Sequence, residues 1–250
     1  EAKGTGATAL KLYANLPSNL VRKITAEAHR QGLRVWTHAT IFPASPMDAV
    51  DAGADTISHS PYLVWAAAPK VPDDYGVRAM GDFTHIRPDA PQIVALFKAM
   101  KQRGTILDAT LLPFLEEAKH DPSKVGAGIM PWSYAVTRLA HQQGVPIDVG
   151  TDSSGLLADA QGPDLKALPL VHSEMALLVE HCGFTPLEAI RAATQISAAA
   201  MGQSAQRGTI APGKRADLVV LNADPTHDIG NTRKIDFVIK GGRIYPRDGD

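Results

Sequence analysis

The chain has 250 residues, of which 44% are hydrophobic and 20% charged, a composition typical of a globular protein that can bury a sizeable core. Its formal net charge is -1 and no run of Lys or Arg forms a basic stripe, so nucleic acid is not an expected partner. Apolar stretches are short and interrupted, which predicts a soluble protein without the span of about 20 apolar residues that a bilayer requires. The single cysteine, Cys182, excludes an intramolecular disulfide and a cysteine metal cluster.

A short apolar strand, a polar break and an amphipathic helix repeat from residue 7 to about residue 200. In "SNLVRKITAEAHRQG" we expect Ser18 as the N-cap and Gly32 as the stop, and the strand "LRVWTH" follows directly. "SPMDAVDAG" repeats the arrangement, with Ser45 as the N-cap, before the strand "ADTISHS". The pattern predicts five strands, near residues 9, 35, 57, 107 and 148, and a loop over about residues 61 to 90.

Strands that alternate with helices and are rich in Val, Ile and Leu indicate a parallel sheet covered by helices. A doubly wound sheet and a (β/α)8 barrel both fit, although no glycine-rich phosphate turn follows any strand. "TPLEAIRAAT" carries a capping box from Thr185 to Glu188. After residue 205 the pattern becomes strand-like, and Gly241 and Gly242 predict a tight hairpin turn. A small β element is therefore expected to close the chain.

Four of the expected strands lead into a side chain that can bind a metal or move a proton. Lys11 lies in "ALKLY", His38 ends "RVWTH", His59 ends "TISH", and Asp152 ends "IDVGTD". Taken singly, each has an ordinary interpretation: a hydrogen-bonded structural histidine, a buried lysine with a partner, or an aspartate that caps a turn. Because the active site of a barrel is built at the carboxyl ends of its strands, the four together favour a metal site.

These motifs resemble the amidohydrolase superfamily of metal-dependent hydrolases, in particular its imidazolonepropionase-like and Xaa-Pro or Xaa-Arg dipeptidase-like branch. "GATALKLYAN" resembles the family's fourth strand, "AEAHRQGLRVWTHA" its fifth, "AVDAGADTISHS" its sixth and "GVPIDVGTDSSG" its eighth. "TPLEAIRAATQISAAAMG", "RGTIAPGKRADLVVLNADP" and "VIKGGRIY" are similar to the segments that follow. The resemblance implies an α/β fold. Residues 1–205 would form the C-terminal part of a (β/α)8 TIM-like barrel, strands 4 to 8 with their helices, and residues 206–250 strands of a small β-sandwich domain.

The resemblance also implies a function: a hydrolase that cleaves a carbon–nitrogen bond, in an amide, cyclic amide or dipeptide, through a metal-bound hydroxide. Lys11 would carry a carbamate derived from CO2 and bridge two divalent cations, with zinc as the expected metal. His38 and His59 would bind the second cation through neutral imidazole nitrogens. Asp152 would bind the first cation and act as general base and then as general acid.

Four further residues are candidates for substrate binding. Tyr13 lies on the same side of its strand as the lysine and could hydrogen-bond a substrate carbonyl or carboxylate, with packing as the alternative. His172 opens a later helix, where it could touch substrate or lie at a solvated helix end. Tyr62 and Arg78 belong to the loop after the second histidine, and such loops either rim a pocket or are anchored by their aromatic residues.

One departure from the family pattern is a missing His-x-His pair, which the family carries on its first strand. We therefore expect a missing N-terminal segment, with that pair and strands one to three, as a partner of this chain. Two other hypotheses stay open: a non-catalytic fragment that acts as a binding or assembly subunit, and a mononuclear deaminase-like enzyme, against which Lys11 speaks. The sequence leaves open the exact substrate, the compartment and whether the chain forms a homo-oligomer.

Overall fold

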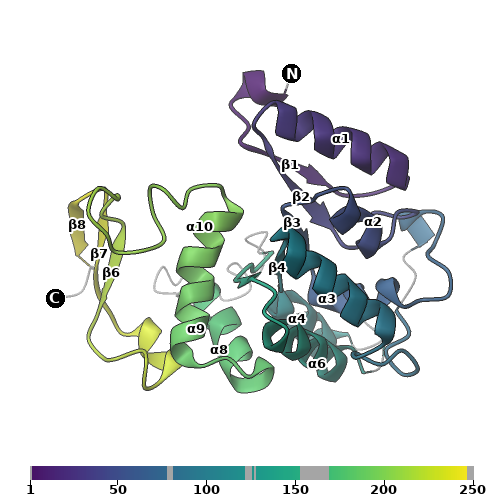
Figure 1. Ribbon diagram of the computed structural model, residues 1–250. Coiled ribbons are helices and arrows are strands. Elements are labelled where there is room, and N and C mark those ends of the chain that lie inside the picture. Colours follow the sequence, from purple (N-terminus) through teal and green to yellow (C-terminus); the bar gives the residue numbers. More distant parts are fainter. Residues whose placement is uncertain (1, 78–80, 122–125, 127, 153–168, 247–250) are drawn as a thin grey trace. The chain divides into compact units, whose positions relative to one another are not determined.

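The computed structural model describes residues 2–77, 81–121, 126, 128–152 and 169–246 (Figure 1). The chain forms two compact units, Glu1–Asp148 and Val149–Asp250, and each is described by itself. The boundary expected at residues 205 and 206 stays a prediction. Among the helices of the described ranges, none has both the length and the apolar character needed to cross a bilayer.

The first unit contains a parallel sheet of five strands in the order β1-β2-β3-β4-β5. The strands are β1 (Ala9–Leu12), β2 (Arg34–His38), β3 (Thr56–Ser58), β4 (Ile106–Asp108) and β5 (Ile147–Asp148). They lie at the five positions that the sequence predicted. Each strand pairs with its predecessor in the sequence, and a helical connection joins the two, as parallel pairing requires.

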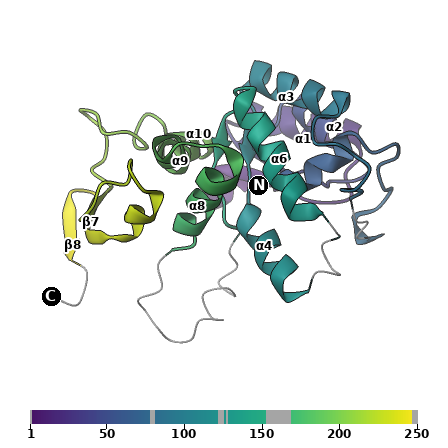
Figure 2. The same cartoon turned by 90° about the horizontal axis from the view of Figure 1, so that it is seen from below.

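Helices accompany every strand of the first unit. In Figure 1, α1, α2 and α3 lie side by side along the sheet, and Figure 2 shows α4 next to α6. The helices are α1 (Ser18–Arg30), α2 (Pro46–Asp51), α3 (Pro91–Arg103), α4 (Leu111–His120) and α6 (Ile129–Gln142), with 3-10 turns η1 (Ala2–Thr5), η2 (Ser60–Ala66) and η3 (Tyr75–Val77). The sequence predicted a loop over residues 61 to 90. This prediction is partly wrong, because η2 overlaps the start of the segment and η3 lies within it.

The two faces of the parallel sheet differ in chemistry. Along one face the register aligns Ile57 with Leu107 and Leu107 with Ile147, and all three side chains are buried. Leu10, on the same face, lines a groove with side chains of α1, so this aliphatic face is the one that the helices cover. We call the other side the polar face. It carries Lys11, Trp36, His38, Ser58, Asp108 and Asp148.

Helix starts agree with the sequence in α2 and differ in α1. Ser45 is the N-cap of α2 and forms a capping box with Asp48, as its spacing predicted. The N-cap of α1 is Pro17, and Ser18 is the first helical residue without a capping hydrogen bond, so the Ser18 prediction was wrong. Pro17 occupies the cap position because its fixed φ suits the extended backbone found there.

The second unit combines a helical segment with a small antiparallel sheet. Its elements are α8 (Val171–Cys182), α9 (Pro186–Arg191), the π-helical turn η4 (Ala192–Ile196), α10 (Ser197–Ala200), β6 (Leu218–Leu221), the 3-10 turn η5 (Ile229–Arg233), β7 (Ile235–Lys240) and β8 (Arg243–Pro246). Thr185 and Glu188 form the expected capping box at the start of α9. Gly241 and Gly242 both have positive φ and join β7 to β8, which confirms the hairpin.

The two serines at the starts of α1 and α2 give a matched stability test. We expect Ser45→Ala to lower the free energy of unfolding by about 1 kcal/mol, because the Asp48 backbone N–H at the start of α2 loses its acceptor, Ser45 Oγ. Ser18→Ala should change it by less than about 0.5 kcal/mol, since this side chain caps nothing. Urea unfolding of both variants measures the difference. Equal losses would contradict the assignment of the two caps.

Candidate active site

Strained backbone gathers where the parallel strands end. Four non-glycine residues in the described ranges have positive φ: Asn15, His59, Thr110 and Asp152, with values of 57°, 81°, 46° and 42°. Asn15, His59 and Thr110 follow the ends of β1, β3 and β4, whereas Asp152 belongs to the second unit. A left-handed residue with a Cβ costs about 1–2 kcal/mol, and such strain persists at functional sites where surrounding contacts hold it. This edge of the sheet is therefore the candidate site.

The turn at His59 brings the two predicted histidines together. Ser58 points to the polar face, and an extended strand would send the next side chain to the opposite one. With φ 81° and ψ 89°, the ring of His59 instead lies beside that of His38, with 4.3 Å between the ring centroids and 58° between the ring planes. Its backbone N–H still donates to the carbonyl oxygen of Asp108 (2.8 Å). Both imidazoles are 4% exposed.

Burial keeps both histidines neutral. It lowers the pKa of His38 to about 3, and the positive charge of Lys11 acts in the same direction. Burial also holds the pKa of His59 well below its usual value, with smaller contributions from His38 and Lys11. A neutral imidazole retains a lone pair, and this is the form that binds a divalent cation.

Two threonines fix the orientation of the histidine rings. Thr40 Oγ1 lies 2.6 Å from Nδ1 of His38, and the backbone N–H of Thr40 donates to the same nitrogen. Thr110 Oγ1 lies 2.6 Å from Nδ1 of His59. A backbone N–H can only donate, so Nδ1 of His38 is an acceptor in this arrangement and the proton of the neutral ring is on Nε2; a cation bound to His38 would take the place of Thr40 at Nδ1.

The third predicted residue on this face, Lys11, lies in a hydrogen-bonded cluster that the sequence analysis missed. Its Nζ donates to Ser58 Oγ (2.8 Å), Trp36 Nε1–H donates to the same oxygen (2.6 Å), and Ser58 in turn donates to Asp108 Oδ2 (2.9 Å). Ser58 and Asp108 are buried, whereas Lys11 is exposed, so its expected burial was wrong. Lys11 is exposed because it lies on β1, an edge strand of the described sheet.

Aromatic rings surround the histidine pair. His38 lies 4.9 Å from Tyr13, 5.3 Å from Tyr62 and 5.9 Å from Tyr75, measured between ring centroids. The hydroxyls of Tyr13 and Tyr75 are 2.9 Å apart, and the backbone N–H of Tyr75 donates to Asn15 Oδ1 (2.8 Å). Tyr13 and Tyr62 were predicted from the sequence. Tyr75 was missed, because nothing local shows that its turn folds back onto the end of β1.

The remaining predicted residues lie elsewhere. Asp152 is exposed and belongs to the second unit, so its partnership with the residues of the polar face stays a prediction. His172 is buried in the second unit with Nδ1 3.0 Å from Thr232 Oγ1, and burial lowers its pKa. It is therefore not at a solvated helix end. Arg78 lies outside the described residues.

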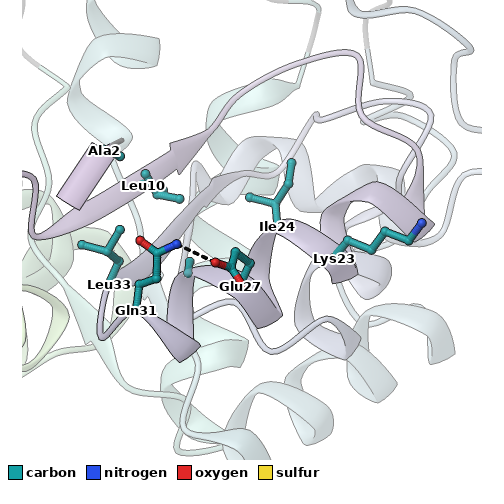
Figure 3. A pocket seen from close by; sticks show the side chains of 8 residues that line it. Ala2, Leu10, Lys23, Ile24, Glu27, Gln31 and Leu33 are labelled. Carbon is teal, nitrogen blue, oxygen red and sulfur yellow. Dashed lines mark hydrogen bonds between the residues drawn. The ribbon is translucent and has the colours of Figure 1, made fainter. Parts of the chain in front are cut away.

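The groove between α1 and β1 is separate from the polar face. Its volume is about 320 Å³, and Figure 3 shows the side chains around it. It is lined by Ala2, Leu10, Lys23, Ile24, Glu27, Ala28, Gln31 and Leu33. Gln31 donates to Glu27 (2.5 Å) within it, and Leu10 enters from the aliphatic face of β1. None of the polar-face residues lines this groove.

The side chains of the polar face suit a divalent cation in part. Two buried, neutral imidazoles beside a lysine are the donor set that a carbamate-bridged site would use, and zinc accepts both nitrogen and carboxylate oxygen. In the part of the chain that the structure describes, no three His, Cys, Asp or Glu side chains form a ligand cluster by themselves. A complete site therefore needs ligands beyond His38 and His59.

Residues 3–245 match the model of the amidohydrolase family. The chain belongs to this family. The imidazolonepropionase of Geobacillus kaustophilus is 38% identical over 109 residues, which are 42% of this chain and 24% of the relative. That of Bacteroides fragilis is 32% identical over 153 residues, 60% of this chain and 31% of the relative.

Solved structures of the family establish the fold. A Xaa-Pro dipeptidase crystallised with methionine in its active site is similar to 98% of this chain, with a TM-score of 0.72 and 22% identity, and the match covers 56% of the dipeptidase. The parallel sheet is thus part of an amidohydrolase TIM-like barrel, as the resemblance predicted. The chain spans little more than half of this structure, and its matches cover less than a third of the two imidazolonepropionases.

The depressed histidine pKa values predict loss of stability in acid. His38 titrates at about 3 in the folded protein and at about 6.5 in the unfolded chain. Between these values the unfolded chain binds more protons, so the free energy of unfolding falls as the pH falls, by up to about 1.4 kcal/mol per pH unit from this residue. Urea unfolding of EDTA-treated protein between pH 7 and pH 4 measures the slope. We expect His38→Asn to make the slope shallower, and an unchanged slope would refute the neutral, buried state of this ring.

Proposed function

We propose that the chain is part of a metal-dependent hydrolase that cleaves carbon–nitrogen bonds, and that its polar face supplies one side of a two-metal centre. The observation that carries this proposal is the contact between two buried, neutral imidazoles at the ends of neighbouring strands, beside Lys11. Two buried, neutral imidazoles side by side can each offer a nitrogen lone pair to the same metal ion. Membership of the amidohydrolase family supports the same class of reaction.

Each residue has a defined part in the proposal. His38 and His59 would hold one cation, the carbamate on Lys11 would bridge two, and Asp152 would hold the other. Zinc is the metal that we propose, and bound divalent cations supply Lewis-acid activation of the amide carbonyl and of water. An Asp152 carboxylate oxygen accepts the proton of the attacking water and passes it to the leaving nitrogen, so that the amine departs neutral.

The proposed substrate is a small amide, either a cyclic amide or a dipeptide or N-acyl amino acid. The names of the relatives support these two classes, since one is an imidazolonepropionase and the other a Xaa-Pro dipeptidase. Tyr13 is half exposed and lies 4.9 Å from His38, so its hydroxyl is suited to bind a carbonyl or carboxylate beside the cations. Tyr62 offers a ring face to an apolar substituent. His172 and Arg78 remain proposed contacts to substrate.

The proposal includes a partner segment. The family's His-x-His pair is absent from this chain, and we propose that a polypeptide carrying it completes the first metal site. A non-catalytic binding or assembly subunit is the second candidate function. It is favoured by the same absence, and by the lack of a three-ligand cluster within the described residues. Metal content separates the two candidates.

Metal content and hydrolysis test the proposal together. We expect protein purified with zinc and bicarbonate to hold about two cations per complete site, and Lys11→Ala or His38→Asn to lose at least one of them. Asp152→Asn should lower kcat on N-acyl amino acids or dipeptides by about 10²- to 10⁴-fold, because it removes the proton carrier. Inductively coupled plasma mass spectrometry and an amine-release assay give the two readouts.

The control for these variants is His29→Asn, an exposed histidine on α1 that contacts Asp55. It should keep both the metal and the activity of the parent. A parent protein that binds no metal and hydrolyses none of these amides would instead support the non-catalytic subunit.

A further inference from the structure

Ser58 occupies a position from which it can orient Lys11. We infer that its hydroxyl is the positioning group for the lysine carbamate: it accepts the Nζ–H of Lys11 and so directs the new carboxylate away from itself. This inference rests on the proposed function, since it needs a carbamate on Lys11. Ser58 is fully buried and lies one residue before His59, on the polar face between Lys11 and Asp108.

The polarity of each hydrogen bond to Ser58 Oγ follows from the chemistry of its neighbours. A hydroxyl has one proton to donate and two lone pairs that accept. The indole N–H of Trp36 can only donate, and it occupies one lone pair at 2.6 Å. The carboxylate of Asp108 accepts the single hydroxyl proton at 2.9 Å. The one remaining position on Ser58 is an acceptor, and Nζ of Lys11 donates to it at 2.8 Å.

This fixed polarity decides which part of the amine reacts. Because Ser58 has no second proton, it cannot donate to the lone pair of a neutral Lys11 amine, and that lone pair points away from it. In carbamylation the lone pair forms the bond to the carbon of CO2, one C–O π pair moves onto oxygen, and one N–H proton leaves to solvent. The product nitrogen keeps a single N–H. Ser58 can accept that N–H, which fixes the side of the nitrogen that faces Ser58 and so sets the direction of the new carboxylate.

The surroundings favour the same orientation. Asp108, which accepts the hydrogen bond from the Ser58 hydroxyl, is 5% exposed, and the register of β3 and β4 aligns it with Ser58. Trp36 also lies beside Lys11, with Nζ 5.8 Å from the indole ring centroid. The side of the amine that faces Ser58 is therefore held in place.

The test compares carbamate content in Ser58 variants of the full chain, in the assembly in which it purifies. Protein equilibrated with ¹³C-bicarbonate and zinc should show a carbamate resonance in ¹³C NMR. We expect Ser58→Ala to lower its occupancy by on the order of fivefold to tenfold, because a carbamate that Ser58 no longer orients is held less well by the cations that stabilise it. Ser58→Thr, which keeps the hydroxyl, should retain at least about half of it. Zinc content should fall with carbamate across the set.

Ser60→Ala is the matched control. Ser60 is equally buried and lies two residues further along the chain, but its Oγ has no hydrogen-bond partner among the described residues, so the same substitution should leave the carbamate unchanged. If Ser58→Ala does not fold, as judged by circular dichroism, Ser58→Cys keeps the volume with a weak hydrogen-bonding group and should show an intermediate loss.

The outcomes separate this inference from the proposed function. A parent with carbamate that Ser58→Ala or Ser58→Cys retains in full would overturn the role of Ser58 and leave the hydrolase proposal standing. A parent without any carbamate, in the presence of zinc and bicarbonate, would overturn both. Equal losses in Ser58→Ala and Ser60→Ala would mean that general packing, and not this hydrogen bond, sets the carbamate content.

Discussion

The in-register parallel pairing of β1 to β5 is the constraint on which the candidate site depends. Side chains alternate between the two faces of every strand, and the register aligns the alternation from one strand to the next. One face therefore becomes mostly aliphatic, with Thr37 as its polar member, and packs under the helices. The other gathers Lys11, His38, Ser58 and Asp108 from four different strands. A slip of one residue in any pair would exchange the two sets, so register and chemistry are fixed together.

Regular strands alone would not produce the histidine pair. The pair requires His59 to leave the alternation, and its left-handed backbone does this at a cost of about 1–2 kcal/mol. The contact of its ring with Thr110, and its backbone hydrogen bond to Asp108, offset part of that cost. Thr110 is left-handed as well, so the two strained residues hold each other across neighbouring strand ends. The backbone conformation that strains His59 is thus also the one that holds its ring beside the ring of His38.

The sequence predicted the five strands and the Lys, His, His order because both depend on local patterns: short apolar runs between helices, and the polar residue in or after each run. It did not predict that Ser58, Trp36 and Asp108 form the cluster around Lys11. Those hydrogen bonds join residues 22 to 50 positions apart, and their existence depends on register, which no single segment specifies. The exposure of Lys11 was missed for a similar reason, since a strand lies at an edge or in the middle only through its neighbours. The Asp152 prediction is the least constrained, because that residue follows the boundary between the two compact units.

The sequential strand order has a consequence for how the first unit folds. Each of β2 to β5 pairs with its predecessor, so each of these pairings closes a segment of only a few tens of residues. Assembly can then proceed during synthesis, with one strand and one helix added at a time to a growing sheet. The polar face would be built in the same order, beginning with Lys11 and gaining Ser58 before Asp108. The hydrogen-bonded cluster would thus close only when β4 docks, late in the formation of the sheet.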